Sequence, residues 1–427
     1  MARKMKDSGI EWIGEIPEGW EIVPVRSCFD EVRTKNTDGQ EQNALQFKSG
    51  NIISKTNFNA SMDDYVADTI TNYTVVLPDT VMINGLNLNY DFKSLRVALV
   101  KEKGVITSAY LAIFPDRKKI SPQYATYLFK GYETKMAFHN MGAGIRKTLG
   151  YKEFKNQPLL LPSKEEQNKI SAYLDSKCSH IDIMLSKICS SVEEYKKLKQ
   201  AVITQAVTKG VRGEREMKDS GVEWIGEIPK EWICEKIKYA TSISRGLFNH
   251  RPRNDERYYN GKYPFIQTGD VANATKYIVS YSQTLNELGK AVSKEFPKGT
   301  LTMTIAANVG DVAILNFDAY FPDSVVGFIP NKNIRTLYLF YVFSAMKDEF
   351  TRTAIKSTQL NLNIDRVKET FIPVTLNVNE QCEIENYLES KCAEIDGLIA
   401  KKEQLVKELE GYKKSLIYEV VTGKREM

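Results

Sequence analysis

The chain has 427 residues, of which 42% are hydrophobic and 26% are charged, and its formal net charge is +5. This composition is typical of a water-soluble globular protein, and the length is better accommodated by two domains than by one core. No uncharged apolar run approaches the ~20 residues of a membrane span, and the start, MARKMKDSG, lacks the apolar stretch of a signal peptide, so we expect a cytoplasmic protein.

The first feature along the chain is a segment that occurs twice. MKDSGIEWIGEIPEGW starts at Met5 and MKDSGVEWIGEIPKEW starts at Met217, and thirteen of the sixteen letters agree. A second segment, EQNKISAYLDSKCSHID from Glu166, returns as EQCEIENYLESKCAEID from Glu380. The chain is therefore an internal duplication of a unit of about 212 to 214 residues, and the segments between the shared parts have almost no similarity.

Each of these dissimilar segments predicts a module of short strands and helices. In the first module, strands are predicted at TVVLP, RVALV and AYLAIF, which begin at Thr74, Arg96 and Ala109, and a helix at SPQYATYLFKGYETKMAFHNM. In the second module, the corresponding runs are YPFIQTGDV, TLTMTIAA and VAILNF, followed by a helix at IRTLYLFYVFSAMKDEFTRT. The predicted fold class of both modules is α/β (α+β).

Each module is followed by a long heptad pattern. Ser163 stands three residues before Glu166, as in a capping box, and Asn377 precedes Glu380 in the same way. From there apolar residues recur in steps of four and three, an average of about 3.5 that is typical of a coiled coil. The predicted seam consists of Leu174, Ile181, Leu185, Ile188, Val192 and Lys199 in the first helix and of Leu388, Ile395, Ile399, Val406, Leu409 and Lys413 in the second.

We expect the two helices to pair antiparallel as a spacer between the modules, with pseudo-twofold symmetry. A lysine at the same seam position of each copy, Lys199 and Lys413, would fix the register. The alternative is a pair of ordinary amphipathic helices that pack on their own modules, although ~45 residues exceeds the usual length of a globular helix. The predicted domains are the modules 1–162 and 215–376 and the helices 163–214 and 377–427.

Polar loops in both modules are the candidate nucleic-acid interface. The segment from Ile243 to Lys262 carries five Arg or Lys residues against two acidic ones, with aromatic and amide side chains between them. Arg and Lys neutralise phosphates, and Arg, Asn and Gln can pair with base edges. A solvated basic loop is the alternative for any one segment alone. The candidate DNA-binding residues are Lys48, Lys93, Arg96, Arg146 and Lys147 in the first module and Arg245, Asn249, Arg251, Arg253, Asn254, Lys356 and Gln359 in the second.

The sequence contains no motif for catalysis or metal binding. The phosphate-binding loop, the Rossmann glycine fingerprint and the N-P-P-[FY] motif of adenine methyltransferases do not occur. The three histidines have no partner at metal-ligand spacing, and six cysteines without a C-x-x-C pair predict neither a disulfide scaffold nor a zinc site. Cys178 and Cys392 are expected to be buried thiols. Pro115-Asp116 with Glu133-Thr-Lys135 matches a loose nuclease pattern, but Glu133 falls in a predicted helix, so we expect no nuclease site.

The duplication occurs together with the segments WIGEIPEGW, LPSKEEQNKISAYLDSK and SLIYEVVTGK. In these features the chain resembles the DNA-specificity subunit of type I restriction–modification systems. The resemblance implies two target-recognition domains, each of which reads one half of a split, asymmetric DNA site, and helices that fix the gap between the halves. It also implies a non-catalytic chain that docks two methyltransferase subunits.

Those partner subunits would bind S-adenosylmethionine and methylate adenine, with ATP and Mg²⁺ on a restriction subunit where one is present. No residue code for bases can be transferred from the family. The alternative function is a structural adaptor, with two protein-binding modules on a coiled-coil rod and no role on DNA.

Overall fold

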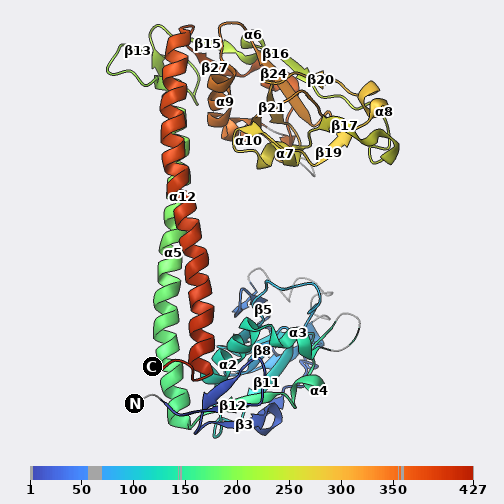
Figure 1. The fold of residues 1–427 in the computed structure, drawn as a ribbon, viewed down its shortest axis with the longest axis vertical. Helices are drawn as coiled ribbons and strands as arrows, with labels where there is room; N and C mark the ends of the chain where they lie inside the picture. Colours follow the sequence, from blue (N-terminus) through green and yellow to red (C-terminus); the bar gives the residue numbers. More distant parts are fainter. Residues whose placement is uncertain are drawn as a thin grey trace. The chain divides into compact units, whose positions relative to one another are not determined.

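The computed structural model describes residues 3–55, 70–142, 144, 147–353, 355–356 and 360–426. The chain divides into two compact units, and each is described by itself (Figure 1). Unit 1 consists of Met1–Cys189 and Glu403–Met427, and unit 2 consists of Ser190–Lys402. Each unit therefore contains one module, a part of the first long helix and a part of the second. In the described residues, no helix is both long enough and apolar enough to span a membrane.

The module of unit 1 is built on antiparallel strands. The strands β4, β11, β8 and β9 are neighbours in that order in one sheet, and β12 pairs with β3. The elements are β1 (Met5–Asp7), β2 (Glu15–Pro17), β3 (Glu21–Pro24), β4 (Phe29–Glu31), β5 (Leu45–Lys48), β6 (Asn51–Ser54), β7 (Thr74–Val76), β8 (Val81–Ile83), β9 (Val97–Leu99), β10 (Gly104–Ile106), β11 (Leu111–Pro115), α2 (Pro122–Thr134), α3 (Ala137–Met141), α4 (Tyr151–Phe154) and β12 (Pro158–Leu161).

The sheet that contains β8 is covered on both faces. Val81 and Ile83 lie in the same apolar cluster as Phe129 of α2, whereas Met82 between them lies in a cluster with Leu45 of β5. Successive strand residues point to opposite faces, so α2 covers one face and the hairpin β5–β6 covers the other. Burial on both faces explains why β8, β9 and β11 are short continuous apolar runs rather than alternating ones.

The two larger sheets in the described part of unit 2 have the orders β16-β24-β21-β22-β18 and β19-β17-β23-β20, and the pairs β13-β14, β15-β27 and β25-β26 form two-stranded sheets. Pairing is antiparallel except for β18 with β22 and β17 with β23. The elements are β13 (Met217–Asp219), β14 (Glu227–Pro229), β15 (Ile233–Lys236), α6 (Ile237–Ala240), β16 (Thr241–Arg245), β17 (Tyr259–Phe265), α7 (Thr268–Asn273), β18 (Tyr277–Ile278), β19 (Gln283–Leu285), α8 (Glu287–Ala291), β20 (Glu295–Phe296), β21 (Leu301–Thr304), β22 (Val312–Leu315), β23 (Ala319–Tyr320), β24 (Val325–Pro330), α9 (Thr336–Ala345), α10 (Lys347–Thr353), β25 (Ile355–Lys356), β26 (Leu360–Asn361), α11 (Ile364–Glu369) and β27 (Phe371–Val374).

Most predicted strands are confirmed, and three local predictions need correction. The run YPFIQTGDV is a strand only as far as Phe265, because the Asp270 carboxylate accepts a hydrogen bond from Gln267 N at 2.8 Å and caps the short helix α7. The helical run of the first module is two helices, α2 and α3, because Met136 between them adopts φ = +53°. The corresponding run of the second module is likewise divided into α9 and α10.

The long helices are α5 (Lys164–Lys209) and α12 (Val378–Val421). Their predicted N-caps are confirmed, since Ser163 Oγ accepts from Glu166 N at 3.3 Å and Asn377 Oδ1 accepts from Glu380 N at 3.3 Å. The reciprocal half of each capping box is not formed, because the two glutamate side chains bind elsewhere. A glycine with positive φ follows each helix. Gly210 comes directly after the last residue of α5, and Gly423 comes shortly after the last residue of α12.

The two long helices run antiparallel within each unit. In unit 1, Leu174 near the start of α5 shares an apolar cluster with Val420 near the end of α12. In unit 2, Val207 near the end of α5 shares a cluster with Leu388 near the start of α12. The same clusters contain module residues, so each helix end packs on its module as well as on the other helix.

The seam lysines form ion pairs between the helices. Lys413 Nζ lies 2.6 Å from Asp182 in unit 1, and Lys199 Nζ lies 2.7 Å from Asp396 in unit 2. The buried seam residues are Leu174, Ile181, Val192, Leu388 and Ile395, and the half-buried ones are Leu185, Ile188, Lys199, Ile399, Val406, Leu409 and Lys413. Cys178 and Cys392 are buried free thiols, as predicted.

Candidate nucleic-acid interface

Arg96, a predicted DNA-binding residue, is buried beneath a loop of the first module. Its exposed fraction is 1%. The guanidinium donates to the carbonyl oxygens of Asn84 and Leu86 at 2.9 Å and of Asp91 at 2.5 Å. A buried charge is costly unless it is hydrogen-bonded, so these three carbonyls explain how the arginine is tolerated there. Arg96 therefore presents no exposed guanidinium for the predicted DNA contact, which stays a prediction. Arg96 instead holds residues 84–95, which we call the Arg96 loop.

The Arg96 loop is hydrogen-bonded to residues 147–149, which precede α4 and include Lys147. Leu88 N donates to Lys147 O at 3.2 Å, and Leu149 N donates to Gly85 O at 2.9 Å. A Cβ at Gly85 would lie 2.4 Å from the Leu149 carbonyl oxygen, so a side chain at this position would prevent the approach. The two segments, distant in sequence, therefore form one continuous surface.

Three predicted lysines of the first module lie on this surface or next to it. Lys93 belongs to the Arg96 loop, and Lys147 belongs to the segment tied to it. Lys48 ends β5, and in the turn that follows, a Cβ at Gly50 would lie 3.0 Å from the Cβ of Leu95 in the loop. All three lysines are exposed. The structure therefore brings Lys48, Lys93 and Lys147 onto neighbouring segments.

Three arginines of the second module converge on Asp323, between β23 and β24. Arg245 Nε donates to the Asp323 carbonyl oxygen at 2.5 Å, and the Arg251 guanidinium lies 3.6 Å from its carboxylate. Arg253 forms a direct ion pair with the same carboxylate. One carboxylate balances one positive charge, so the group keeps an excess of positive charge at the surface. Asn249 is exposed beside these arginines in the sequence.

Asn254 is exposed as well, and it is the last candidate of this loop in chain order. Arg146 and Gln359 lie outside the described residues. For Lys356 only the backbone is described, in β25, which pairs with β26. These three predictions remain predictions.

A contact that the sequence analysis missed supports the basic loop of the second module. Asp255 accepts from the Arg257 guanidinium at 2.7 Å and lies 3.0 Å from the His250 ring nitrogen Nε2. The hydrogen bond from Arg257 holds the pKa of the Asp255 carboxyl well below its ordinary value. The His250 ring stacks on Tyr258, with 4.0 Å between ring centroids. The signal in the sequence was Asp255 two residues before Arg257, where an aspartate can cap a turn.

Glu133, the acidic residue of the loose nuclease pattern, lies in α2 as predicted. Its carboxylate accepts a hydrogen bond from the backbone N–H of Arg96, and burial raises its pKa to about 7. The Glu133 side chain therefore holds the backbone of Arg96 at the end of the Arg96 loop. Within the described ranges, no three His, Cys, Asp or Glu side chains lie close enough to hold a metal ion.

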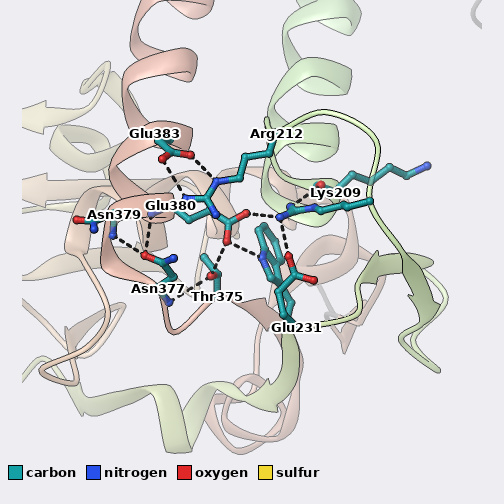
Figure 2. Close-up of polar contacts among 10 residues, drawn as sticks. Lys209, Arg212, Glu231, Thr375, Asn377, Asn379, Glu380 and Glu383 are labelled. Carbon is teal, nitrogen blue, oxygen red and sulfur yellow. Dashed lines mark hydrogen bonds and ion pairs between the residues drawn. The ribbon is translucent and has the colours of Figure 1, made fainter.

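A buried carboxylate anchors α12 to the second module, and Figure 2 shows the polar contacts around it. Glu380 is 1% exposed. It accepts from the Arg215 guanidinium at 2.6 Å, from Trp232 Nε1 at 3.1 Å and from Thr375 Oγ1 at 3.0 Å. Arg215 also donates to the carbonyl oxygen of Lys209, the last residue of α5, at 2.9 Å. The end of α5, the start of the module and the start of α12 are therefore joined at one point.

The first copy repeats this anchor. Trp20 Nε1 donates to Glu166 at 2.9 Å, and Arg3 forms an ion pair with the same carboxylate. In both copies the arginine lies over the tryptophan ring, 5.4 Å from its centroid. This anchor explains why the tryptophan and the glutamate occur in both copies of the repeated segments.

Arg215→Ala should destabilise the protein by about 3 kcal/mol, because it leaves a buried carboxylate without its cation. Arg212→Ala is the matched control, since Arg212 pairs with Glu383 at 2.7 Å but both side chains are more than 40% exposed. Such surface pairs contribute about 0–1 kcal/mol. Urea unfolding of the full-length variants measures both effects. Equal losses in the two variants would show that burial of Glu380 does not matter.

A glutamine at the start of each long helix binds the main chain of its module. Gln167 Oε1 accepts from Ser121 N at 2.7 Å, and its Nε2 donates to the carbonyl oxygens of Lys119 and Pro162 at 3.0 Å. Gln381 makes the same three contacts, with Arg335 N at 2.8 Å and the carbonyl oxygens of Asn333 and Thr375 at 2.8 and 2.7 Å. These six bonds attach the modules to the helices.

The chain is similar in sequence to specificity subunits of type I restriction enzymes. Residues 246–408 match the model of the family described as "Type I restriction modification DNA specificity domain". The chain is 24% identical to the putative type I restriction enzyme MjaX specificity subunit of Methanocaldococcus jannaschii, covering 96% of this chain and 95% of that relative. The MjaVIII specificity subunit of the same organism is also 24% identical, with 96% and 93% covered.

A solved structure has the same fold. It was reported in work on complex assembly and conformational transition of the type I R-M system. Its TM-score to this chain is 0.71 at 16% sequence identity, and the match covers 96% of this chain and 99% of that one.

Proposed function

We propose that the chain is a DNA-specificity subunit of a type I restriction–modification system and that it reads a bipartite, asymmetric DNA site for partner subunits. Each module reads one half of the site. The chain itself is a non-catalytic member of the complex and directs restriction–modification partner subunits to the DNA. Two methyltransferase subunits dock on it and hold S-adenosylmethionine for adenine methylation. Where a restriction subunit joins them, that subunit uses ATP and Mg²⁺.

The observation that carries this proposal is the repeated attachment of two dissimilar modules. The contacts of Glu166 and Gln167 recur at Glu380 and Gln381, while the modules that they hold differ in sequence and in sheet order. Equal attachments with different surfaces support two readers with different targets. Exposed lysines in one module and arginines around Asp323 in the other supply the positive charge that phosphates attract.

Sequencing of methylated adenine in the host, with and without this gene, tests the proposal. The expected result is one split sequence whose methylation depends on the gene. An unchanged methylation pattern, together with no binding of the purified complex to any host DNA, would favour an adaptor without a role on DNA.

The helices α5 and α12 set the gap between the two half-sites in this proposal. Each is continuous, with 46 and 44 residues, and each contributes to both units. At ~1.5 Å per residue they are long enough to separate two recognition modules along a duplex. The proposed arrangement is two recognition modules with an antiparallel helix pair between them.

Arg251→Ala and Arg253→Ala should weaken DNA binding. If the guanidiniums contact phosphates, each variant should bind all sequences less tightly, and the slope of log affinity against log salt should fall by about one. If they read bases, each should cost ~1–3 kcal/mol and relax specificity in one half-site. Lys230→Ala is the control, because Lys230 is exposed and pairs with Glu216 at 2.7 Å outside the basic loop. Unaltered binding of the double variant would remove this loop from the interface.

A further inference from the structure

Two exposed aromatic side chains stand on the Arg96 loop of the first module. Tyr90 is 74% exposed, the largest fraction of any aromatic side chain in the described residues, and Phe92 is 56% exposed. Leu95 on the same loop is also exposed. Large apolar groups gathered on one surface segment commonly mark an interaction site, because their exposure to water is unfavourable.

The loop that carries these rings is fixed by hydrogen bonds. The Arg96 guanidinium binds three of its carbonyl oxygens, including that of Asp91. The Asp91 carboxylate accepts from the backbone N–H groups of Lys93 at 3.1 Å and Ser94 at 3.0 Å. Hydrogen bonds from Ser94 lower the pKa of Asp91 to about 2, so it is ionised at neutral pH. The fold therefore uses a buried arginine and an ionised aspartate to hold this turn.

Phe92 is partly supported by a neighbouring ring and stays 56% exposed. The ring of His139 stacks on it, with 5.1 Å between centroids and an interplanar angle of 12°. His139 Nε2 also lies 3.2 Å from the Asp91 carbonyl oxygen, which attaches the ring pair to the fixed turn. One ring of the loop is thus oriented while most of its surface stays open. A ring held in this way loses little conformational entropy when a planar partner stacks on it.

The charge around the rings indicates the occupant. Lys93 lies on the same loop, and Lys48 and Lys147 lie on the segments that contact it, all three exposed. A partner that satisfies both features must present negative charge and flat apolar faces within a few ångströms of each other. Duplex DNA does so, since phosphates flank stacked bases, and apolar side chains can be inserted between base steps.

We propose that Tyr90 and Phe92 insert against bases of the first half-site while the three lysines bind the adjacent phosphates. This inference rests on the function proposed above and assigns two residues to it. The rings partly unstack one base step, and the sequence preference of that step adds to the specificity of the first module, because steps differ in the energy needed to deform them.

The test uses the full chain purified with its methyltransferase partners and a duplex that contains the methylated sequence found in the host. Tyr90→Ala with Phe92→Ala should weaken binding by roughly 5- to 150-fold for each base that loses a stacking partner. The salt slope should stay unchanged, because no charge is removed. Lys93→Ala and Lys147→Ala should each lower that slope by about one. Tyr90→Phe should bind as the parent does, since the ring is kept.

A base analogue locates the contact. With 2-aminopurine at successive positions of the first half-site, fluorescence should rise at one step on binding, and the rise should be absent in the double variant. Tyr412→Ala, which removes an exposed ring on α12, is the control and should change neither readout. Thermal unfolding of the ring variants should change little, because Tyr90, Phe92 and Tyr412 are all exposed and Phe92 loses only its stacking on His139.

Three outcomes would contradict the inference or its premise in distinguishable ways. If the parent binds DNA and the double variant binds equally well, Tyr90 and Phe92 are not DNA contacts. If the double variant binds DNA normally but copurifies with less methyltransferase, the surface is a protein interface. If the parent complex binds no DNA, the proposed function itself fails.

Discussion

A chain in which residues 21–162 also replace residues 233–376 should direct methylation to the first half-site twice, in inverted orientation. The two exchanged segments have nearly equal lengths, and each begins directly after an anchor tryptophan, Trp20 or Trp232. Because each module reads its own half-site in the proposed function, a chain with two identical modules has only one half-site to read. In the proposed arrangement the copies are related by a pseudo-twofold axis, and this relation predicts an inverted repeat.

The contacts of the transplanted module support this expectation. In unit 1, Tyr127 OH donates to Asp175 of α5 at 2.6 Å. In unit 2, Tyr341 OH donates to Glu389 of α12, which occupies the equivalent position. A transplanted Tyr127 therefore meets an acceptor of the same kind. The Gln381 side chain likewise finds the backbone groups that Gln167 binds in the original copy.

The readout is the methylated sequence in a host that lacks the original gene. The reciprocal exchange, with residues 233–376 in both places, is the matched control and should give the second half-site twice. Retention of the original asymmetric sequence would show that specificity lies outside the exchanged segments. A direct repeat instead of an inverted one would show that the copies are not related by a twofold axis.

Insertion of one heptad into each long helix should lengthen the gap between the half-sites by about three base pairs. The insertion points are given by the boundary between the units, after Cys189 in α5 and after Lys402 in α12, so that contacts inside each unit are kept. Seven residues preserve the heptad register and add about 10.5 Å of helix. At ~34 Å per ten base pairs, this is the length of about three base pairs.

The same insertion turns one half-site by about 100° around the duplex, so we expect weaker binding together with the longer gap. Methylation sequencing shows whether both half-sites are unchanged and the gap is longer. An insertion in α5 alone is the control, and it should destabilise the protein because only one of the paired helices is lengthened. Methylation across the original gap by the doubly extended chain would show that the helices do not set the distance.

Features with a short repeat were predictable from the sequence. The long helices follow from the steps of three and four between apolar residues, and their starts follow from Ser163 and Asn377. The strands around Val75 and Ala98 follow from short apolar runs between turn residues. Each of these signals depends on residues that lie within about one heptad of each other in the chain. Such a signal can therefore be recognised from the sequence alone.

Contacts between distant segments could not be predicted in this way. Arg96 was expected at the surface because arginine usually lies there, yet a loop closes over it through carbonyl oxygens that any sequence would supply. The arginines around Asp323 were recognised as a basic loop, but their acidic partner lies about seventy residues further along the chain. The exposure of Tyr90 was not predictable either, since aromatic residues are more often buried.

The bonds of Gln167 and Gln381 have a consequence for how such modules can evolve. The residues whose backbone Gln167 binds, Lys119 and Ser121, correspond to Asn333 and Arg335 in the second copy. Side chains at these positions differ while the bonds are the same, because amide and carbonyl groups are common to nearly every residue. Mutations can therefore accumulate in a module without weakening its attachment, and a lineage can acquire a new target without first rebuilding the scaffold.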